Sequence, residues 1–359
     1  MCSSRIVRLA AAAVLVPAAS ASAQIVINLH PAGTSASFAY GVQNGQQVGQ
    51  ARVGSVLHAS LWSGSAASWI DLHPTGATGN SIAFASANGR QVGAAVFSGV
   101  QRAGVWNGTA ASWVDLHPAG VDHSLASGIH NGQQAGLVQV GFEVHASLWT
   151  GTASSWVDLH PAGAEDSDAT SVHNGQQVGR AVFANVAHAG YWTGTAASWV
   201  DLHPAGAIES YALGVFNGRQ VGLFRFGSDA HAGLWNGTAA SLVDLHPVGA
   251  TYSRAYGIGD GFQVGDAFIG GVTHASLWSG TAESWVDLSL DLTGSWGNTV
   301  ARSVWSDGGT LFIAGEGFNM TTGRVEALLW TRPVPEPGSL ALFAASAALA
   351  ATFRLRRTR

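Results

Sequence analysis

Short apolar segments separated by glycine-containing turns follow one another along the middle of the chain. The segments 211–215 and 220–224 flank Asn217-Gly218, and such a pair favours a type I′ hairpin because both residues adopt positive φ. A tryptophan-containing segment comes next in each unit, then a Gly-Thr-Ala turn and a segment such as 198–202. His203-Pro204 ends that segment, because proline cannot donate a hydrogen bond to a sheet. The pattern therefore predicts four short β-strands per unit.

Three markers of this unit each occur seven times. The first is a tryptophan, at Trp62, Trp106, Trp149, Trp192, Trp235, Trp278 and Trp330. Neighbouring tryptophans are 43 or 44 residues apart, except for the last pair, which is 52 apart. An Asn-Gly or Asp-Gly turn and an Asp-Leu-His-Pro motif, degraded at its two ends, repeat with the same period. A period of about 40–45 residues with four strands per unit is typical of β-propeller blades.

The two ends of the repeat region complement each other. Residues 25–29 read as a fourth strand without the three strands before it, and residues 325–330 read as a third strand without its fourth. Pairing them closes a ring and removes two exposed strand edges. We therefore predict an all-β, seven-bladed propeller over residues 24–332, in which the N-terminal strand closes the last blade. The first strand of each unit, rich in alanine and glycine, is expected at the crowded axis, and the tryptophans between blades.

Residues 1–23 have the features of a signal peptide. Arg5 and Arg8 precede an apolar run, and small residues end at Ala23, which predicts cleavage between Ala23 and Gln24. Export and the absence of any cysteine other than Cys2 predict a mature chain that is stabilised by packing, with no disulfide.

Residues 333–359 carry a second processing signal. Pro335-Glu336-Pro337 precedes an apolar stretch over 340–353, and the chain then ends in a cluster of four arginines. This order resembles the PEP-CTERM sorting domain. The resemblance implies a transmembrane helix that anchors the precursor in the inner membrane of a Gram-negative bacterium. It also implies recognition by an exosortase-type enzyme and delivery to the cell surface or extracellular matrix.

The repeat itself is similar to a second family. His58-Ala59-Ser60-Leu61-Trp62, followed by Val-Asp-Leu and by Asn-Gly-Gln-Gln-Val-Gly motifs, resembles the extracellular repeat of the HAF family. Serine, as at Ser60, or glycine, as at Gly190, stands where that family has phenylalanine. The resemblance implies an exported protein and adds little about its ligand.

Charge narrows the choice of partners. The chain has no lysine, and residues 24–334 hold 10 arginines against 20 carboxylates, a formal charge of −10. A body of this sign repels phosphate backbones, which argues against nucleic acid as a partner.

Repeated histidines and aspartates are candidates for chemistry by residue type. Each Asp-Leu-His-Pro motif supplies one histidine, and a second set precedes the tryptophans. Metal ligation needs three or four groups that converge within about 2 Å of one ion, whereas copies around a ring diverge. We therefore expect the histidines to satisfy turn backbone and the aspartates to form hydrogen bonds at strand ends, with no metal or cofactor.

A unique site should lie where the units differ. The connection after His-Pro and the loop before the tryptophan strand are expected on one face, and the distinctive residues there are Asp122, His123, Glu165, Asp166, Asp168 and Glu209, with Tyr211, Tyr252 and Arg254. The group Glu165, Asp166 and Asp168 has the oxygen ligands that Ca²⁺ takes, although a solvated acidic loop explains it better.

The expected function follows from these features. No catalytic motif and no catalytic residue can be named. The sequence favours an exported, non-enzymatic surface protein that binds exopolysaccharide or another surface partner. A carbohydrate-active enzyme, lyase or glycosidase, on a propeller scaffold is the alternative, and a structural surface spacer is the third possibility.

Overall fold

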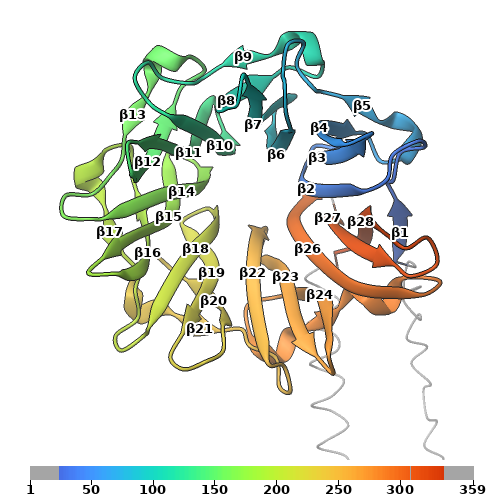
Figure 1. Ribbon diagram of the computed structural model, residues 1–359. Helices are drawn as coiled ribbons and strands as arrows, with labels where there is room; N and C mark the ends of the chain where they lie inside the picture. Colours follow the sequence, from blue (N-terminus) through green and yellow to red (C-terminus); the bar gives the residue numbers. More distant parts are fainter. Residues whose placement is uncertain (1–23, 308, 335–359) are drawn as a thin grey trace, which may run out of the picture.

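Seven four-stranded antiparallel sheets form a ring around a central channel (Figure 1). The computed structural model describes residues 24–307 and 309–334. Blade 1 contains β2 (Ser37–Gln43), β3 (Gln46–Val53), β4 (Val56–Trp62) and β5 (Ile70–Asp71), ordered from the axis outward. The predicted all-β architecture with seven blades is confirmed.

The other blades repeat this order. They are β6 (Ser81–Ala87), β7 (Arg90–Phe97), β8 (Val100–Trp106), β9 (Val114–Asp115); β10 (His123–His130), β11 (Gln133–Val140), β12 (Glu143–Trp149), β13 (Val157–Asp158); β14 (Asp166–His173), β15 (Gln176–Phe183), β16 (Val186–Trp192), β17 (Val200–Asp201); β18 (Glu209–Phe216), β19 (Arg219–Arg225), β20 (His231–Trp235), β21 (Val243–Asp244); β22 (Tyr252–Gly259), β23 (Phe262–Ile269), β24 (Val272–Trp278), β25 (Val286–Asp287); and β26 (Trp296–Asp307), β27 (Thr310–Asn319), β28 (Arg324–Pro333), β1 (Ile25–Asn28).

The fourth strands are shorter than the sequence predicts. The expected strand over 198–202 is only Val200–Asp201, because residues 196–198 form a single 3₁₀ turn. The Ser198 hydroxyl accepts from the Thr193 N–H and donates to the Thr195 carbonyl oxygen, so it holds this turn closed. The short helices are η1 (Ala66–Ser68), η2 (Ala110–Ser112), η3 (Ala153–Ser155), η4 (Ala196–Ser198), η5 (Ala239–Ser241), η6 (Ala282–Ser284) and η7 (Leu288–Asp291).

The hairpins between first and second strands have the predicted geometry. Asn44 and Gly45 both have positive φ, at 49° and 74°, as a type I′ turn requires. The same holds for the Asn-Gly and Asp-Gly turns of blades 2 to 6. In blade 7, Gly308 of the expected Asp307-Gly308 turn lies outside the described residues.

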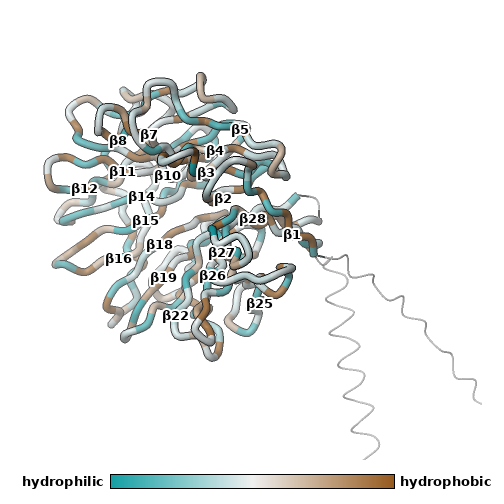
Figure 2. The backbone as a smooth tube through the Cα atoms, turned by 45° about the vertical axis from the view of Figure 1, so that its right-hand side comes forward, coloured by the Kyte–Doolittle hydropathy of each residue, from teal (hydrophilic) through white to brown (hydrophobic). Residues whose placement is uncertain are grey.

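The repeated tryptophans lie between blades, as expected. Trp62 is fully buried against Leu29 and Ala327 of blade 7, and Trp106 is buried against Leu61 and Leu72 of blade 1. Hydrophobic and hydrophilic residues are mixed all round the ring in Figure 2. Burial of one tryptophan contributes roughly 4–6 kcal/mol before the cost of ordering the chain, so each blade depends on its neighbour.

The same hydrogen bond joins every pair of neighbouring blades. At the first junction, the Ala59 N–H in the third strand of blade 1 donates to the Ser81 hydroxyl at the start of blade 2, with N and O 2.8 Å apart. The equivalent pairs are Ala103–Ser124, Ala146–Ser167, Ala189–Ser210, Ala232–Ser253, Ala275–Thr299 and Ala327–Ser37. The last pair joins the two ends of the chain, so the closing junction has the same register as the other six.

The ring closes through the N-terminal strand. β1 pairs with β28 antiparallel, from Ile25 opposite Thr331 to Asn28 opposite Leu328, and the two strands lie side by side in Figure 2. The predicted closure is therefore confirmed, with the strand ending one residue earlier than expected. Gln24 precedes β1 directly, and Val334 beyond β28 donates its N–H to the Gly309 carbonyl oxygen at the blade 7 hairpin turn. Both described ends therefore leave from one face, which we call the turn face.

The opposite, loop face carries the connections between blades and the turns between second and third strands. There the Asp122 N–H donates to the Gln139 carbonyl oxygen and the Glu165 N–H to that of Val182. This confirms that the two kinds of loop share a face. The predicted signal peptide, its Ala23 side of the cleavage site, the sorting residues Pro335, Glu336 and Pro337 and the predicted transmembrane helix lie outside the described residues. Among residues 24–307 and 309–334, no helix has the length and apolar character needed to cross a membrane.

The closing blade has a polar pair of its own. Glu326 occupies the position held by His58 in blade 1, and Asn28 occupies that of Asp71. The Glu326 carboxylate is 1% exposed and accepts hydrogen bonds from Asn28 at 2.6 Å and Arg324 at 2.7 Å. Although burial works against it, these bonds and those from Asn319 and Thr322 lower the pKa of Glu326 to about 2.

Replacing Asn28 by aspartate is expected to weaken ring closure. In Asn28→Asp, a donor is lost and a second carboxylate faces the buried Glu326, which should reduce the free energy of unfolding by about 2–3 kcal/mol at pH 7. Urea unfolding would measure this change. The control is Asp71→Asn, which alters the equivalent position of blade 1, places no second carboxylate beside a buried one and should have less effect. Equal stability of Asn28→Asp and the parent chain would contradict this account of closure.

Candidate binding site

A β-bulge in the first strand of every blade directs one side chain into the channel. In blade 1 the pairing register shifts between Ala39 and Gly41, which leaves Tyr40 as the extra residue, and the same shift occurs in all seven blades. Bulges re-aim side chains in this way. We call the seven extra residues the bulge ring: Tyr40, Phe84, Ser127, Thr170, Leu213, Tyr256 and Arg302.

A glycine in the second strand makes room for each bulge. A Cβ atom on Gly265 would lie 1.8 Å from the carbonyl oxygen of Arg254, and one on Gly49 would lie 1.9 Å from that of Phe38. No side chain fits at such distances. The repeated glycine of the second strand is therefore required for the close approach of the bulged first strand, which forms the channel wall.

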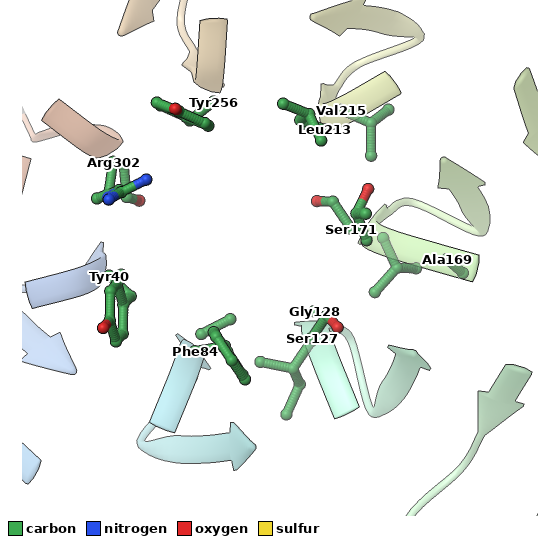
Figure 3. A pocket seen from close by; sticks show the side chains of 18 of the residues that line it. Tyr40, Phe84, Ser127, Gly128, Ala169, Ser171, Leu213, Val215, Tyr256 and Arg302 are labelled. Atoms are coloured by element: carbon green, nitrogen blue, oxygen red, sulfur yellow. The ribbon is translucent and has the colours of Figure 1, made fainter. Parts of the chain in front are cut away.

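The channel is a cavity of about 670 Å³ lined by the whole bulge ring. Its wall is asymmetric (Figure 3): the large side chains Tyr256, Arg302, Tyr40 and Phe84 come from the consecutive blades 6, 7, 1 and 2. The smaller Ser127, Thr170 and Leu213 come from blades 3, 4 and 5. The Arg302 guanidinium lies 4.8 Å from the centre of the Tyr256 ring, within the range of a cation–π interaction. A channel with one aromatic, cationic side can orient a ligand, which a seven-fold symmetric channel cannot do.

Buried carboxylates stand behind this wall. The Arg302 Nε and Nη2 atoms donate to Glu316 Oε1 at 2.9 and 2.5 Å. Asp266, fully buried, accepts from Arg254 and from the Tyr256 hydroxyl. Burial raises the pKa of Glu316, and Arg302 opposes that rise. Burial also raises the pKa values of the Tyr40 and Tyr256 hydroxyls, so both stay protonated at neutral pH.

A second cavity of about 340 Å³, which we call the rim pocket, opens between blades 5 and 6 at the loop face. Tyr211 and Tyr252 belong to its wall, with Glu209 and Arg225 paired at 2.9 Å. Residues 228–230 complete the wall of the rim pocket. They are available because the loop between the second and third strands is longer in blade 5 than in the other blades. The rim pocket therefore gathers Glu209, Tyr211, Tyr252 and Arg254, four of the residues singled out in the sequence.

The remaining predicted ligand-face residues do not gather. Asp122 accepts from the Gly141 N–H, Glu165 from the Asn185 N–H and Asp166 from the Val144 N–H, so each binds backbone of a nearby turn or strand. His123 accepts a 3.3 Å hydrogen bond from the Gln101 N–H in the same way.

Asp168 belongs to the channel instead. It lines the cavity and binds Arg180 Nε at 2.6 Å, and burial raises its pKa while Arg180 opposes the rise. Glu165, Asp166 and Asp168 therefore have three different partners. Only Glu165 fits the solvated-loop interpretation, because Asp166 and Asp168 belong to β14.

The repeated histidines and aspartates clasp neighbouring blades. In blade 4, Asp201 accepts from the His188 ring at 2.7 Å and from the His203 N–H. The His203 ring lies between the Ala207 carbonyl oxygen and the Ser210 hydroxyl of blade 5, and it stacks on His188 with centroids 4.0 Å apart. Since a carbonyl oxygen only accepts, Nε2 of His203 carries the proton and Nδ1 faces the hydroxyl. These rings satisfy turn backbone, as the sequence predicts.

One group has metal-ligand spacing in the part of the chain that the structure describes. Ligand atoms of Glu143, His145 and His160 lie within 4.8 Å of one another. However, the His160 ring contacts the Ala164 carbonyl oxygen and the Ser167 hydroxyl, so both of its nitrogens are occupied in the blade clasp. The group belongs to the clasp and supplies no set of free ligands.

Sequence analysis missed Tyr40, Tyr256, Arg302, Asp266 and Glu316. A signal was present at two repeat positions. Arg302 and the two tyrosines stand between the alanine and the small residue of the first strand, where blade 3 has serine. Asp266 and Glu316 directly follow the glycine of the second strand, where blade 2 has alanine. Comparing the seven units at these two strand positions, instead of comparing their loops, would have identified all five residues.

Comparison with known proteins bears on the C-terminal segment and on the fold. Residues 333–357 match the family model of the PEP-CTERM protein-sorting motif. The match indicates a protein that is exported as a membrane-anchored precursor in a Gram-negative bacterium and processed by an exosortase-type sorting enzyme. No curated protein sequence matches the chain.

Solved structures share the propeller architecture at low identity. The β-propeller domain of the Trilobed protease from Pyrococcus furiosus is similar, with a TM-score of 0.52 and 11% identity over 83% of this chain and 95% of that one. That domain is described as having an open velcro topology, whereas here β1 closes the ring. The Pyrococcus horikoshii acylaminoacyl peptidase (TM-score 0.48, 10% identity, 85% of this chain and 54% of that one) and the tricorn protease (0.44, 9%, 82% and 35%) are more distant. At such identities the likeness shows the fold alone.

The histidine clasps predict a loss of stability in weak acid. Burial first, and the stacked partner histidine second, lower the pKa values of His73, His203 and His246 below 6.5. The unfolded chain therefore binds more protons than the folded one just below pH 6.5. Stability should be full above pH 6.5 and should decline as the pH falls below it. Thermal unfolding at pH 7.5 and pH 5 would measure the decline.

A serine variant provides the matched control for this pH dependence. Blade 6 has Ser289 at the position of His203, and Ser289 binds Asp287 as the histidines bind their aspartates. His203→Ser should therefore fold and should show a smaller difference in midpoint between the two pH values. A difference as large as that of the parent chain would rule out the His203 clasp as a contributor.

Proposed function

We propose that this exported surface protein is a non-catalytic binding module that takes a saccharide chain, such as the exopolysaccharide of its own cell, in the central channel. The observation that carries the proposal is the asymmetric wall of the bulge ring, where Tyr40, Phe84, Tyr256 and Arg302 replace the smaller residues of blades 3 to 5. Aromatic faces with a few fixed polar groups in a cavity of this size are typical of ligand sites.

The carboxylates near the channel support binding rather than catalysis. Glycoside hydrolysis needs two carboxyl groups that reach the substrate from opposite sides. Asp266 is fully buried and held by Arg254, and Glu316 is 6% exposed and held by Arg302. Both lie behind the side chains that face the cavity, where they fix the arginines in place. Asp168 does line the channel, but it is bound to Arg180, and the described lining residues include no second carboxylate to act with it.

The position of the chain ends supports display of the site. Val334, at the start of the sorting segment, leaves from the turn face, whereas the rim pocket opens at the loop face. A precursor anchored through its C-terminal segment would thus keep the rim pocket away from its point of attachment. The similarity of the repeat to HAF-family units is in keeping with this role outside the cell.

The proposal is tested by substitutions that introduce the residue found at the same repeat position of another blade. Tyr256→Leu introduces the residue of blade 5 at the same repeat position, and Tyr40→Leu does the same in blade 1. Each should weaken binding of the full chain to purified exopolysaccharide at least tenfold, about 1.4 kcal/mol, through loss of the aromatic face. Titration calorimetry or retention on immobilised polysaccharide would measure this.

Leu213→Ser is the matched control. It introduces the residue that blade 3 has at this position and changes the ring away from Tyr40 and Arg302, so it should alter affinity less than about twofold. No retention of any polysaccharide by the parent chain, or equal losses in all three variants, would refute the proposed site.

A further inference from the structure

Four consecutive blades each carry one arginine–carboxylate pair between their first two strands. The pairs are Arg180–Asp168 (2.6 Å), Arg225–Glu209 (2.9 Å), Arg254–Asp266 (2.5 Å) and Arg302–Glu316 (2.5 Å), in blades 4 to 7. We call them the ion-pair belt. Asp168 and Arg302 line the channel, and Glu209, Arg225 and Arg254 line the rim pocket, so every pair has a member in one of the two cavities.

The belt exposes hydrogen-bond donors without a net positive charge. The arginine side chains are 30–37% exposed, whereas their carboxylate partners are 0–27% exposed. Each guanidinium is compensated at contact distance, and the surrounding body carries a formal charge of −10 over residues 24–334. An anionic ligand would have to separate such a pair or meet the repulsion of the body, and both cost free energy. An uncharged ligand rich in hydroxyl groups meets neither penalty.

One buried carboxylate links the walls of the two cavities. Asp266 accepts hydrogen bonds from Arg254 Nη2, which belongs to the rim pocket, and from the Tyr256 hydroxyl, which belongs to the channel. The Arg254 guanidinium also lies 5.0 Å from the ring centre of Tyr252 and 5.5 Å from that of Tyr256. Tyrosine faces therefore continue from the rim pocket into the channel on either side of one arginine.

From this arrangement we infer that the ligand is an uncharged, polyhydroxylated chain that occupies the rim pocket and the channel together. This inference rests on the proposed function and specifies its substrate class. The channel holds one part of the chain against Tyr256 and Tyr40. The rim pocket holds a further unit against Tyr211 and Tyr252, and the belt supplies donors along the path.

Charge selectivity is tested with chemically matched polymers. Polygalacturonate and alginate fragments are compared with the same fragments after their carboxyl groups have been reduced to alcohols, together with neutral glucan, mannan and galactan fragments. The full chain should bind neutral and carboxyl-reduced fragments at least tenfold more tightly than the acidic ones, and raising NaCl from 20 to 500 mM should change the neutral affinity less than twofold. Equal or tighter binding of acidic fragments would overturn the inference while leaving saccharide binding intact.

Occupation of both cavities is tested with a series of fragment lengths. Tyr252→Asn alters only the rim pocket and introduces the residue that blade 7 has there, Asn298, which caps a backbone N–H of the preceding blade. It should weaken binding of fragments of six to eight units at least fivefold and leave disaccharide binding unchanged. Tyr256→Leu should weaken both.

The outcomes separate the two levels of the proposal. If Tyr252→Asn keeps the parent affinity for long fragments, with an unchanged unfolding midpoint, the two-cavity inference fails and the channel site stands. If the parent chain binds no fragment of either charge at any length, the proposed function fails together with it.

Discussion

The hydrogen bond from an alanine N–H to the serine or threonine hydroxyl of the next blade sets the geometry of the whole ring. It occurs at all seven junctions with N and O 2.8–2.9 Å apart, and one of the seven joins Ala327 to Ser37 across the ends of the chain. A ring closes when the rotations from blade to blade add up to one full turn, and a repeated junction provides nearly equal steps. A buried hydroxyl that is also bound by the clasp histidine, as Ser210 is, leaves little freedom for another register.

The closing blade keeps the same junction geometry although its outer strand, β1, comes from the other end of the chain. Six blades hold the outer strand with His or Arg against Asp, whereas blade 7 uses Glu326 against Asn28. In blade 7 the carboxylate is on the third strand, whereas in the other blades it is on the fourth strand. β1 is therefore a poor partner for the third strands of other blades, because its Asn28 would leave a histidine or an arginine without a carboxylate. Closure between the two ends of the chain is thereby favoured over pairing elsewhere.

The same repeat unit also explains how a symmetric scaffold obtains an asymmetric site. The bulge exposes one side chain per blade to the axis, and that side chain takes no part in the alanine–hydroxyl hydrogen bond that repeats at the junctions. It is free to differ between blades, and Tyr40, Tyr256 and Arg302 cluster on three neighbouring ones. The second-strand residue behind it differs as well, which lets Glu316 and Asp266 hold their arginines while the backbone stays unchanged.

The sequence by itself determined the architecture, because spacing and turn chemistry are local. The Asn-Gly hairpins, the 43-residue period and the complementary end strands define seven blades and their closure, and the histidine and aspartate positions follow from their place in the repeat. The length of the fourth strand was decided by a local 3₁₀ turn at Ser198 that the apolar pattern hides. Only the tertiary structure decided the site. Glu165 and Asp166 stand out in the sequence, yet they bind turn backbone, whereas Tyr40 and Arg302, some 260 residues apart in the chain, meet at one wall. The physical reason is that a bulge directs a side chain to the axis, and ring closure makes blade 7 the neighbour of blade 1.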